Sequence, residues 1–366
     1  MPGIVPLRNQ KGIVMVFLIS KIKKIFVTVV NSTVTAGVFM TLFAWFGVTG
    51  CDIKRESIGA DDEIVIVASH ENHKAIRSAL GQIFSDTIYT PQPEPVYRIK
   101  FAEPDGFNKL ERQTNLIIGN IGTDRTDPGT RLVQQLLGPE RFRETIEGDR
   151  QIIFTRDQFA QNQLFMILSA PTESKLKQAI RGKEEWIRNQ FEKQFEKRQG
   201  KFLFDRARRK KLEKRFLKEY GWEIKIPWGW VVIHDSSEVN FVWIGREMPY
   251  QWISIHWEPG AVVNDSLEVA KYLWEFPEKF YGNIRYNKYR YSIKLTEFNR
   301  WPAWRARGIW ESTEEAQGGP FISYLFYDGQ SDRTYHLNML IFHPGKDKSL
   351  YLRQLDLIAH TFTVKK

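Results

Sequence analysis

The chain has 366 residues, 53 lysines and arginines against 43 aspartates and glutamates, a formal net charge of +10, and one cysteine. One cysteine cannot close a disulfide within the chain or build a cysteine-based zinc or iron–sulfur centre, which excludes disulfide-stapled modules and those metalloproteins. With 42% hydrophobic and 26% charged residues, the composition also excludes an intrinsically disordered chain and a polytopic membrane protein.

The first 50 residues predict a secretory signal. They contain five basic residues and no acidic one, and an apolar run from Ile25 to Val48 follows Lys24. A basic segment, an apolar segment and small residues before a cleavage point occur in this order in signal peptides. A start at Met15 gives a more ordinary signal than a start at Met1, so both starts stay open.

The end of this segment resembles the bacterial lipobox. Val48, Thr49 and Gly50 stand directly before Cys51, the single cysteine of the chain. The resemblance implies that the Cys51 thiol receives a diacylglycerol, that the signal is cut before it, and that the new amino terminus is acylated. A plain membrane anchor is the alternative, because about 20 apolar residues can span a bilayer. Both interpretations place the rest of the chain outside the cytoplasm.

Loss of the signal removes five of the ten net positive charges. The remaining excess is too small to indicate nucleic-acid binding. Residues 51–62 are polar and without periodicity, and they predict a flexible tether between the lipid and the folded part.

Residues 63–200 predict an N-terminal α+β domain that ends in a long charged helix. Pro171 and the N-cap residue Thr172 begin this helix, and the prolines at 91, 93 and 95 break the chain earlier in the domain. The elements expected from hydrophobic periodicity are strands at 63–69, 97–101, 115–119, 151–154 and 163–168 and helices at 70–84 and 131–147.

Residues 181–219 hold 15 basic and 7 acidic residues. One interpretation is a basic arm for anionic lipid or polysaccharide. The other is a pair of solvated helices that joins two halves of the protein, with Gly200 at the break between them.

Residues 201–366 predict a second α+β domain, a tryptophan-rich antiparallel sheet covered by helices. Its opening strand, its meander and its last helix are similar in outline to the PsbP/Mog1-like fold. The expected strands are 223–233, 240–244, 252–257, 286–295, 308–312, 321–327 and 335–343, and the expected helices are 267–280 and 351–362. The fold class is therefore α+β with two mixed halves.

Tryptophan is the compositional outlier of this half, since ten of the twelve lie between 222 and 310. Indole faces stack on sugar rings and the indole N–H donates a hydrogen bond, so a glycan-binding surface is one interpretation and core packing of the sheet is the other. The residues expected to be exposed lie in the irregular stretch 299–310. The candidate binding residues are Trp301, Trp304, Arg305, Arg307 and Trp310.

Gly318, Gly319 and Pro320 combine backbone freedom with a fixed φ, which suits either a ligand cradle or a tight turn before a strand at Phe321. We include Gly318 and Gly319 among the candidate binding residues. His256, His336 and His343 fall on separate strands and are interpreted as structural.

Patterns for catalysis and metal binding are weak. The sequence lacks the zinc-protease, nucleophile-elbow, P-loop and dinucleotide motifs. Ser174 and Lys177 have the spacing of penicillin-recognising enzymes without the partner K-T-G motif. His70 and His73 lie one helical turn apart beside Glu71, which gives two histidine ligands and no third. We therefore predict no catalytic residue, no metal and no cofactor, and the question of an enzyme stays open with a non-catalytic role favoured.

Several segments together resemble an uncharacterised lipoprotein family of the Bacteroidota type, catalogued as a domain of unknown function. They are EIVIVAS, IPWGWVV, FVWI, ARGIWE (306–311), GGPF (318–321) and YLRQLDLIAHTF, in that order. The resemblance implies a lipid-anchored protein of the envelope of a diderm bacterium, and it transfers no catalytic residue.

The predicted function is a lipid-anchored envelope protein that binds or assembles without catalysis. Its partners are the membrane, through the lipid, and an envelope protein or glycan, and its expected location is the outer membrane. The alternative is a glycan-binding or glycan-active protein that uses the tryptophan- and arginine-rich region.

Overall fold

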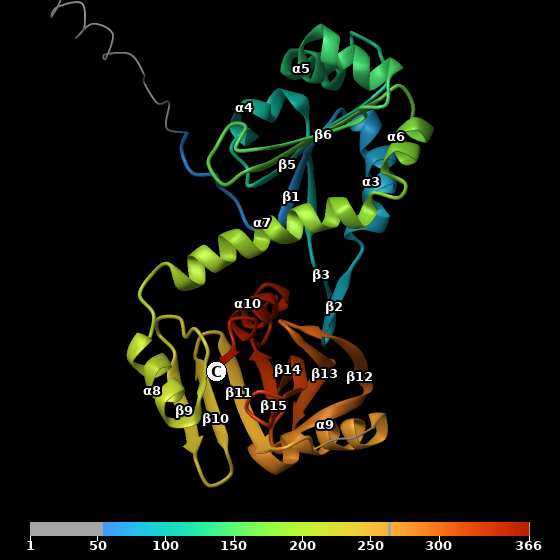
Figure 1. Cartoon of the computed structure of the whole chain (residues 1–366). Coiled ribbons are helices and arrows are strands. Elements are labelled where there is room, and N and C mark those ends of the chain that lie inside the picture. The colour runs from blue at the N-terminus through green and yellow to red at the C-terminus, as the bar shows by residue number, and fades with distance from the viewer. Residues whose placement is uncertain (1–53, 263–264, 366) are drawn as a thin grey trace, which may run out of the picture. The chain divides into compact units, whose positions relative to one another are not determined.

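The computed structural model describes residues 54–262 and 265–365 (Figure 1). The predicted lipobox and Cys51 lie outside these residues. The described residues contain eight helices and sixteen strands, which confirms the α+β class. None of these helices combines the length and the apolar character needed to cross a membrane.

The first half is built on a five-stranded sheet in the order β4-β1-β5-β7-β6. Its first four strands are parallel, and β6 pairs antiparallel with β7, the two strands predicted at 151–154 and 163–168. The strands are β1 (Glu63–Val67), β4 (Arg98–Ala102), β5 (Asn115–Ile121), β6 (Ile152–Arg156) and β7 (Leu164–Ala170).

Helices cover both faces of this sheet, which is why its central strands are apolar on both faces (Figure 1). Ile64 and Ile66 of β1 pack toward α3, α6 and α7, while Val65 and Val67 pack toward α4 and α5. The helices are α3 (His70–Phe84), η1 (Pro104–Gly106), α4 (Phe107–Leu110), α5 (Pro128–Glu147), α6 (Glu173–Ile180) and α7 (Glu184–Phe204), whereas α8 (Lys210–Tyr220) packs against the core of the second half.

The charged stretch 181–219 forms the predicted pair of helices, α7 and α8, while the long helix expected from Pro171 is divided into α6 and α7 by a turn at 181–183. Thr172 caps α6 as predicted, since its hydroxyl accepts from the Lys175 amide at 3.3 Å. The predicted break at Gly200 is wrong, because α7 buries Gln199 and Leu203 on either side of it and continues to Phe204. The chain leaves the helix only at 205–209.

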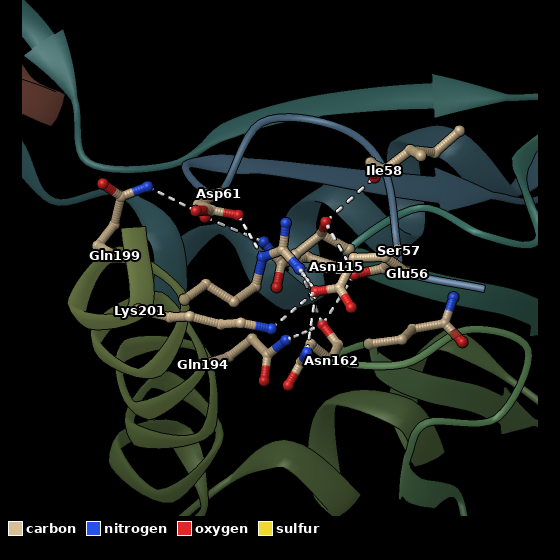
Figure 2. A network of polar contacts seen from close by, with 12 residues as sticks. Glu56, Ser57, Ile58, Asp61, Asn115, Asn162, Gln194, Gln199 and Lys201 are labelled. Atoms are coloured by element: carbon tan, nitrogen blue, oxygen red, sulfur yellow. Dashed lines mark hydrogen bonds and ion pairs between the residues drawn. The ribbon is translucent and has the colours of Figure 1, made fainter. Parts of the chain in front are cut away.

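The flexible tether predicted at 51–62 is wrong for its described part from residue 55 onward. The Ser57 amide donates to the Gln161 carbonyl at 2.9 Å, and the Asp61 carboxylate accepts from Arg198 Nε and Gln199 Nε2, each at 2.5 Å (Figure 2). These partners lie more than 100 positions later in the chain. Composition and hydrophobic periodicity do not report hydrogen bonds to distant residues, and for this reason they predict a flexible segment here.

The second half is a seven-stranded antiparallel sheet in the order β12-β13-β14-β15-β11-β10-β9. Helix α10 (Ser349–Ala359) packs into the core on one face, and α9 (Ser266–Tyr281) packs on the other. The strands are β9 (Val231–Ser236), β10 (Phe241–Arg246), β11 (Tyr250–Pro259), β12 (Ile284–Phe298), β13 (Trp301–Ser312), β14 (Gly318–Asp328) and β15 (Arg333–Phe342), and β8 (Trp222–Glu223) pairs separately with β16 (Thr363–Val364).

The proline-rich segment that we expected to break the chain is a hairpin of β2 (Thr87–Thr90) and β3 (Gln92–Pro95). Prolines are tolerated here because a two-stranded ribbon has outer edges where no amide donor is needed. Ile88 packs against the core of the seven-stranded sheet. The Glu94 carboxylate accepts from the amides of Lys348 and Ser349 at 2.6 and 2.7 Å, and so supplies the cap of α10.

Candidate ligand-binding site

The two most distinctive motifs of the sequence, 306–311 and 318–321, pair with each other on β13 and β14. Gly308 lies opposite Phe321, Trp310 opposite Gly319, and Glu311 opposite Gly318. Segments that are separate in the sequence therefore form one continuous wall. The interpretation of Gly318–Pro320 as a turn is wrong, because β14 already begins at Gly318.

A bulge in β12 shapes the edge of this wall. Tyr286 pairs with Trp310 and Tyr291 with Gly308, so five steps along β12 match two along β13. A Cβ atom on Gly308 would lie 2.0 Å from the Arg290 carbonyl oxygen, and only glycine lets the bulged backbone come this close. Bulges redirect side chains, and here the Arg290 guanidinium carbon lies 4.3 Å from the ring centroid of Tyr89 on β2.

The hairpin and this wall enclose a cavity of about 280 Å³, which we call the hairpin cavity. Its walls are largely apolar, and two arginines but no acidic residue line it. Its lining residues are Thr87, Ile88, Tyr89, Arg290, Tyr291, Ser292, Arg307, Gly308, Pro320, Phe321, Ile322 and Leu352. An open groove of about 900 Å³ shares Arg290 with the cavity and contains Gly318.

Three polar side chains among the lining residues, those of Arg290, Tyr291 and Arg307, have no hydrogen-bond or ion-pair partner in the described part of the chain. The Tyr291 hydroxyl is buried without a hydrogen-bond partner among the described residues, and burial raises the pKa of Tyr291. Arg290 and Arg307 are exposed, and within the described part of the chain neither guanidinium forms an ion pair. An apolar space with a few convergent polar groups is the usual form of a small-molecule site.

Two of the tryptophans expected to be exposed are buried instead. Trp301 donates from Nε1 to Asp328 Oδ1 at 2.8 Å, and Trp310 donates to the Ile341 carbonyl at 3.0 Å. The expectation fails because 301–312 is a regular inner strand rather than an irregular stretch. Gly319 belongs to the same packing, since a Cβ there would lie 1.9 Å from the Ile341 oxygen and 3.2 Å from Trp310 Nε1.

The remaining candidates divide between packing and the cavity. Trp304 is half-buried against the core beneath α9, and Arg305 pairs across the strands with Tyr324, whose hydroxyl donates to Asp356 and whose pKa is raised by burial. Arg307 lines the hairpin cavity and Gly318 lines the groove. Sequence reasoning missed Arg290 and Tyr291, although a glycine inside a strand, here Gly308, can signal a bulge.

The structure adds a third group to the histidine pair at the start of α3. Glu103 Oε1 lies 3.8 Å from His70 Nδ1 and 3.7 Å from His73 Nε2. However, His73 Nε2 also lies 2.8 Å from the Ala68 carbonyl. A nitrogen that donates its proton to a carbonyl has no lone pair for a metal, so this geometry favours hydrogen bonding over metal ligation.

Two histidines that the sequence separates face each other on β11 and β15, where His256 pairs with His336. His336 is fully buried, 4.0 Å from Phe276 between ring centroids, and neither ring nitrogen has a partner among the described residues. Burial, and secondarily the nearby His256, hold the pKa of His336 well below its ordinary value of 6.5.

This burial predicts a loss of stability in acid. As the pH falls below about 6.5, His336 takes up a proton in the unfolded chain but not in the folded one, which lowers the free energy of unfolding by up to about 1.4 kcal/mol per pH unit. Urea unfolding between pH 7.5 and 5.5 should show a shallower pH dependence for His336→Leu. The exposed His70→Gln control should keep the slope of the unchanged protein, and equal slopes in all three would contradict the prediction.

Two family models match the chain. One is described as "Domain of unknown function (DUF8532)" and covers residues 57–203, and the other is described as "Domain of unknown function (DUF4837)" and covers residues 209–361. No curated protein matches the chain.

Solved structures show weak similarity. The Saccharomyces cerevisiae Ran-binding protein Mog1p is 10% identical over 39% of this chain and 90% of its own, with a TM-score of 0.30. LpqN of Mycobacterium tuberculosis, described as involved in cell envelope biogenesis, is 12% identical over 40% of this chain and 83% of its own, with a TM-score of 0.27. A Bacteroides thetaiotaomicron structure is 12% identical over 40% of this chain and 46% of its own, with a TM-score of 0.26. Similarity at this level carries no functional argument.

Proposed function

We propose that this protein is a binding protein of the bacterial cell envelope whose ligand occupies the hairpin cavity. The observation that carries the proposal is the way this cavity is built: a bulge that requires Gly308, two paired motifs and a hairpin anchored to α10 through Glu94 converge on one apolar space. An apolar cavity with a few polar groups at its wall is the usual form of a small-molecule binding site.

The proposal also includes the lipid anchor at Cys51 and the outer membrane as its location. Its support is the basic segment, the apolar run and the residues Val48-Thr49-Gly50 before Cys51. Two or more acyl chains hold a protein on a membrane far better than one. Mass spectrometry of the mature protein should find an amino-terminal peptide that begins at a lipid-modified Cys51. An unmodified Cys51 on an uncut signal would refute the anchor.

The alternative of a glycan-binding surface has less support. Trp301 and Trp310 were its main candidates, and both indole N–H groups are already used inside the protein. Neither residue lines the hairpin cavity or the groove. A buried ring cannot stack on a sugar without exposure of the core around it.

Filling the hairpin cavity should abolish ligand binding. A neutral apolar probe, 1-decanol, is expected to bind the unchanged protein in isothermal titration calorimetry. Ser292→Trp places an indole at the cavity wall and should weaken this binding at least about tenfold, because lost apolar contact of about 1.4 kcal/mol already corresponds to that factor. Ser266→Trp, at an exposed position that begins α9, is the matched control and should bind as before. Absence of decanol binding to the unchanged protein would refute the proposed site.

A further inference from the structure

The charges around the hairpin cavity are unbalanced. Arg290 and Arg307 both line it, and none of its lining residues is acidic. An uncompensated pair of guanidinium groups beside a low-dielectric apolar wall attracts anions more strongly than the same charges in open water.

The carboxylates that line the adjoining groove have other partners. Glu94 accepts from two amides at the start of α10, Glu311 pairs with Arg285 at 3.6 Å, and Asp347 pairs with Arg98 at 3.3 Å. These contacts leave both cavity arginines without a carboxylate of their own among the described residues. Arg290 is also held in place by its position over Tyr89.

The other lining residues have different chemistry. Ile88, Phe321, Ile322 and Leu352 contribute hydrocarbon to the lining. A ligand that satisfies all of these groups has an apolar chain and an anionic end. Guanidinium groups bind carboxylates with two parallel hydrogen bonds, which makes arginine the suitable residue for that end.

We infer that the ligand of the hairpin cavity is a single-chain fatty carboxylate, whose chain lies on the apolar wall and whose carboxylate is bound by Arg290 and Arg307. This inference rests on the proposed function, since it names the chemical class of ligand for the same site. The volume of about 280 Å³ lies just below the roughly 300 Å³ at which ligand pockets usually begin, which suits one chain rather than a two-chain lipid.

The test compares two probes of equal chain length, decanoate and 1-decanol, by isothermal titration calorimetry at low ionic strength. Decanoate should bind the unchanged protein at least about tenfold more tightly, because hydrogen bonds to charged groups contribute that much or more. Arg307→Gln and the double variant Arg290→Gln/Arg307→Gln should lose this preference. Their binding of decanol should persist, which reports that the cavity is still formed. Arg143→Gln, an exposed arginine on α5, is the matched control and should keep the preference.

The outcomes separate the two claims. Equal affinity for decanoate and decanol overturns the inference and leaves the proposed binding site in place. A preference for decanoate that survives in the double variant also overturns it, because the arginines would not be its source. No binding of either probe overturns the proposed site and the inference with it.

Discussion

Replacing Trp310 with alanine is expected to lower the free energy of unfolding by about 3–5 kcal/mol. The side chain is only 1% exposed, it packs against Trp252 and Phe342, and its N–H satisfies the Ile341 carbonyl. The substitution creates a cavity in the core and also leaves the Ile341 carbonyl without its hydrogen-bond donor. Gly319 pairs with Trp310 on the neighbouring strand and has no side chain that could fill the space. Equilibrium unfolding in urea measures the effect.

Trp228→Ala is the matched control, because Trp228 is 72% exposed. Its effect on unfolding should stay within about 0.5 kcal/mol. Equal effects of the two substitutions would contradict the assignment of Trp310 to the core. They would also return the tryptophan set to consideration as a binding surface.

Asp61→Asn is expected to destabilise the protein by about 3 kcal/mol. Asp61 and Arg198 have side chains only 10% and 16% exposed, and their atoms Oδ1 and Nε lie 2.5 Å apart (Figure 2). Removal of one partner from a fully buried ion pair costs about 3–5 kcal/mol, and here Arg198 would keep only the more exposed Glu56, whose Oε1 lies 3.4 Å from Arg198 Nη1. Partial exposure of this pair places the expected value at the lower end. Urea unfolding monitored by circular dichroism is the measurement.

The control for this pair is Glu144→Gln. Glu144 and Arg150 form an ion pair at 3.1 Å with side chains 48% and 74% exposed, and exposed pairs contribute about 0–1 kcal/mol. If Asp61→Asn were as mild as this control, residues 55–62 would be better described as the flexible tether that their composition suggests.

Much of the fold could be predicted from hydrophobic patterns. The run at 63–69 predicts a strand buried on both faces, and β1 is packed between two helical layers. The second half forms the expected antiparallel sheet covered by helices. Patterns of this kind work because they report burial directly, one element at a time.

The site could be predicted only in part, because its key contacts join distant segments. Arg307 and Gly318 were among the expected residues, and they do line the cavity and the groove. Arg290 reaches the cavity through an irregular β12 register, and the hairpin that closes it begins 200 positions earlier. Periodicity describes each element alone and says nothing about which elements meet.

Glu94 of the β2–β3 hairpin caps α10 and so links the two halves of the chain. The donor and acceptor lie 254 positions apart, in segments matched by two separate family models, yet residues 55–366 form one compact unit. The region 209–361 alone would present α10 with its first amides uncapped and the hairpin cavity without one wall. The boundary between the two family models therefore does not coincide with a boundary between independent structural units. A chimera between relatives should take the β2–β3 hairpin and the seven-stranded sheet from the same parent.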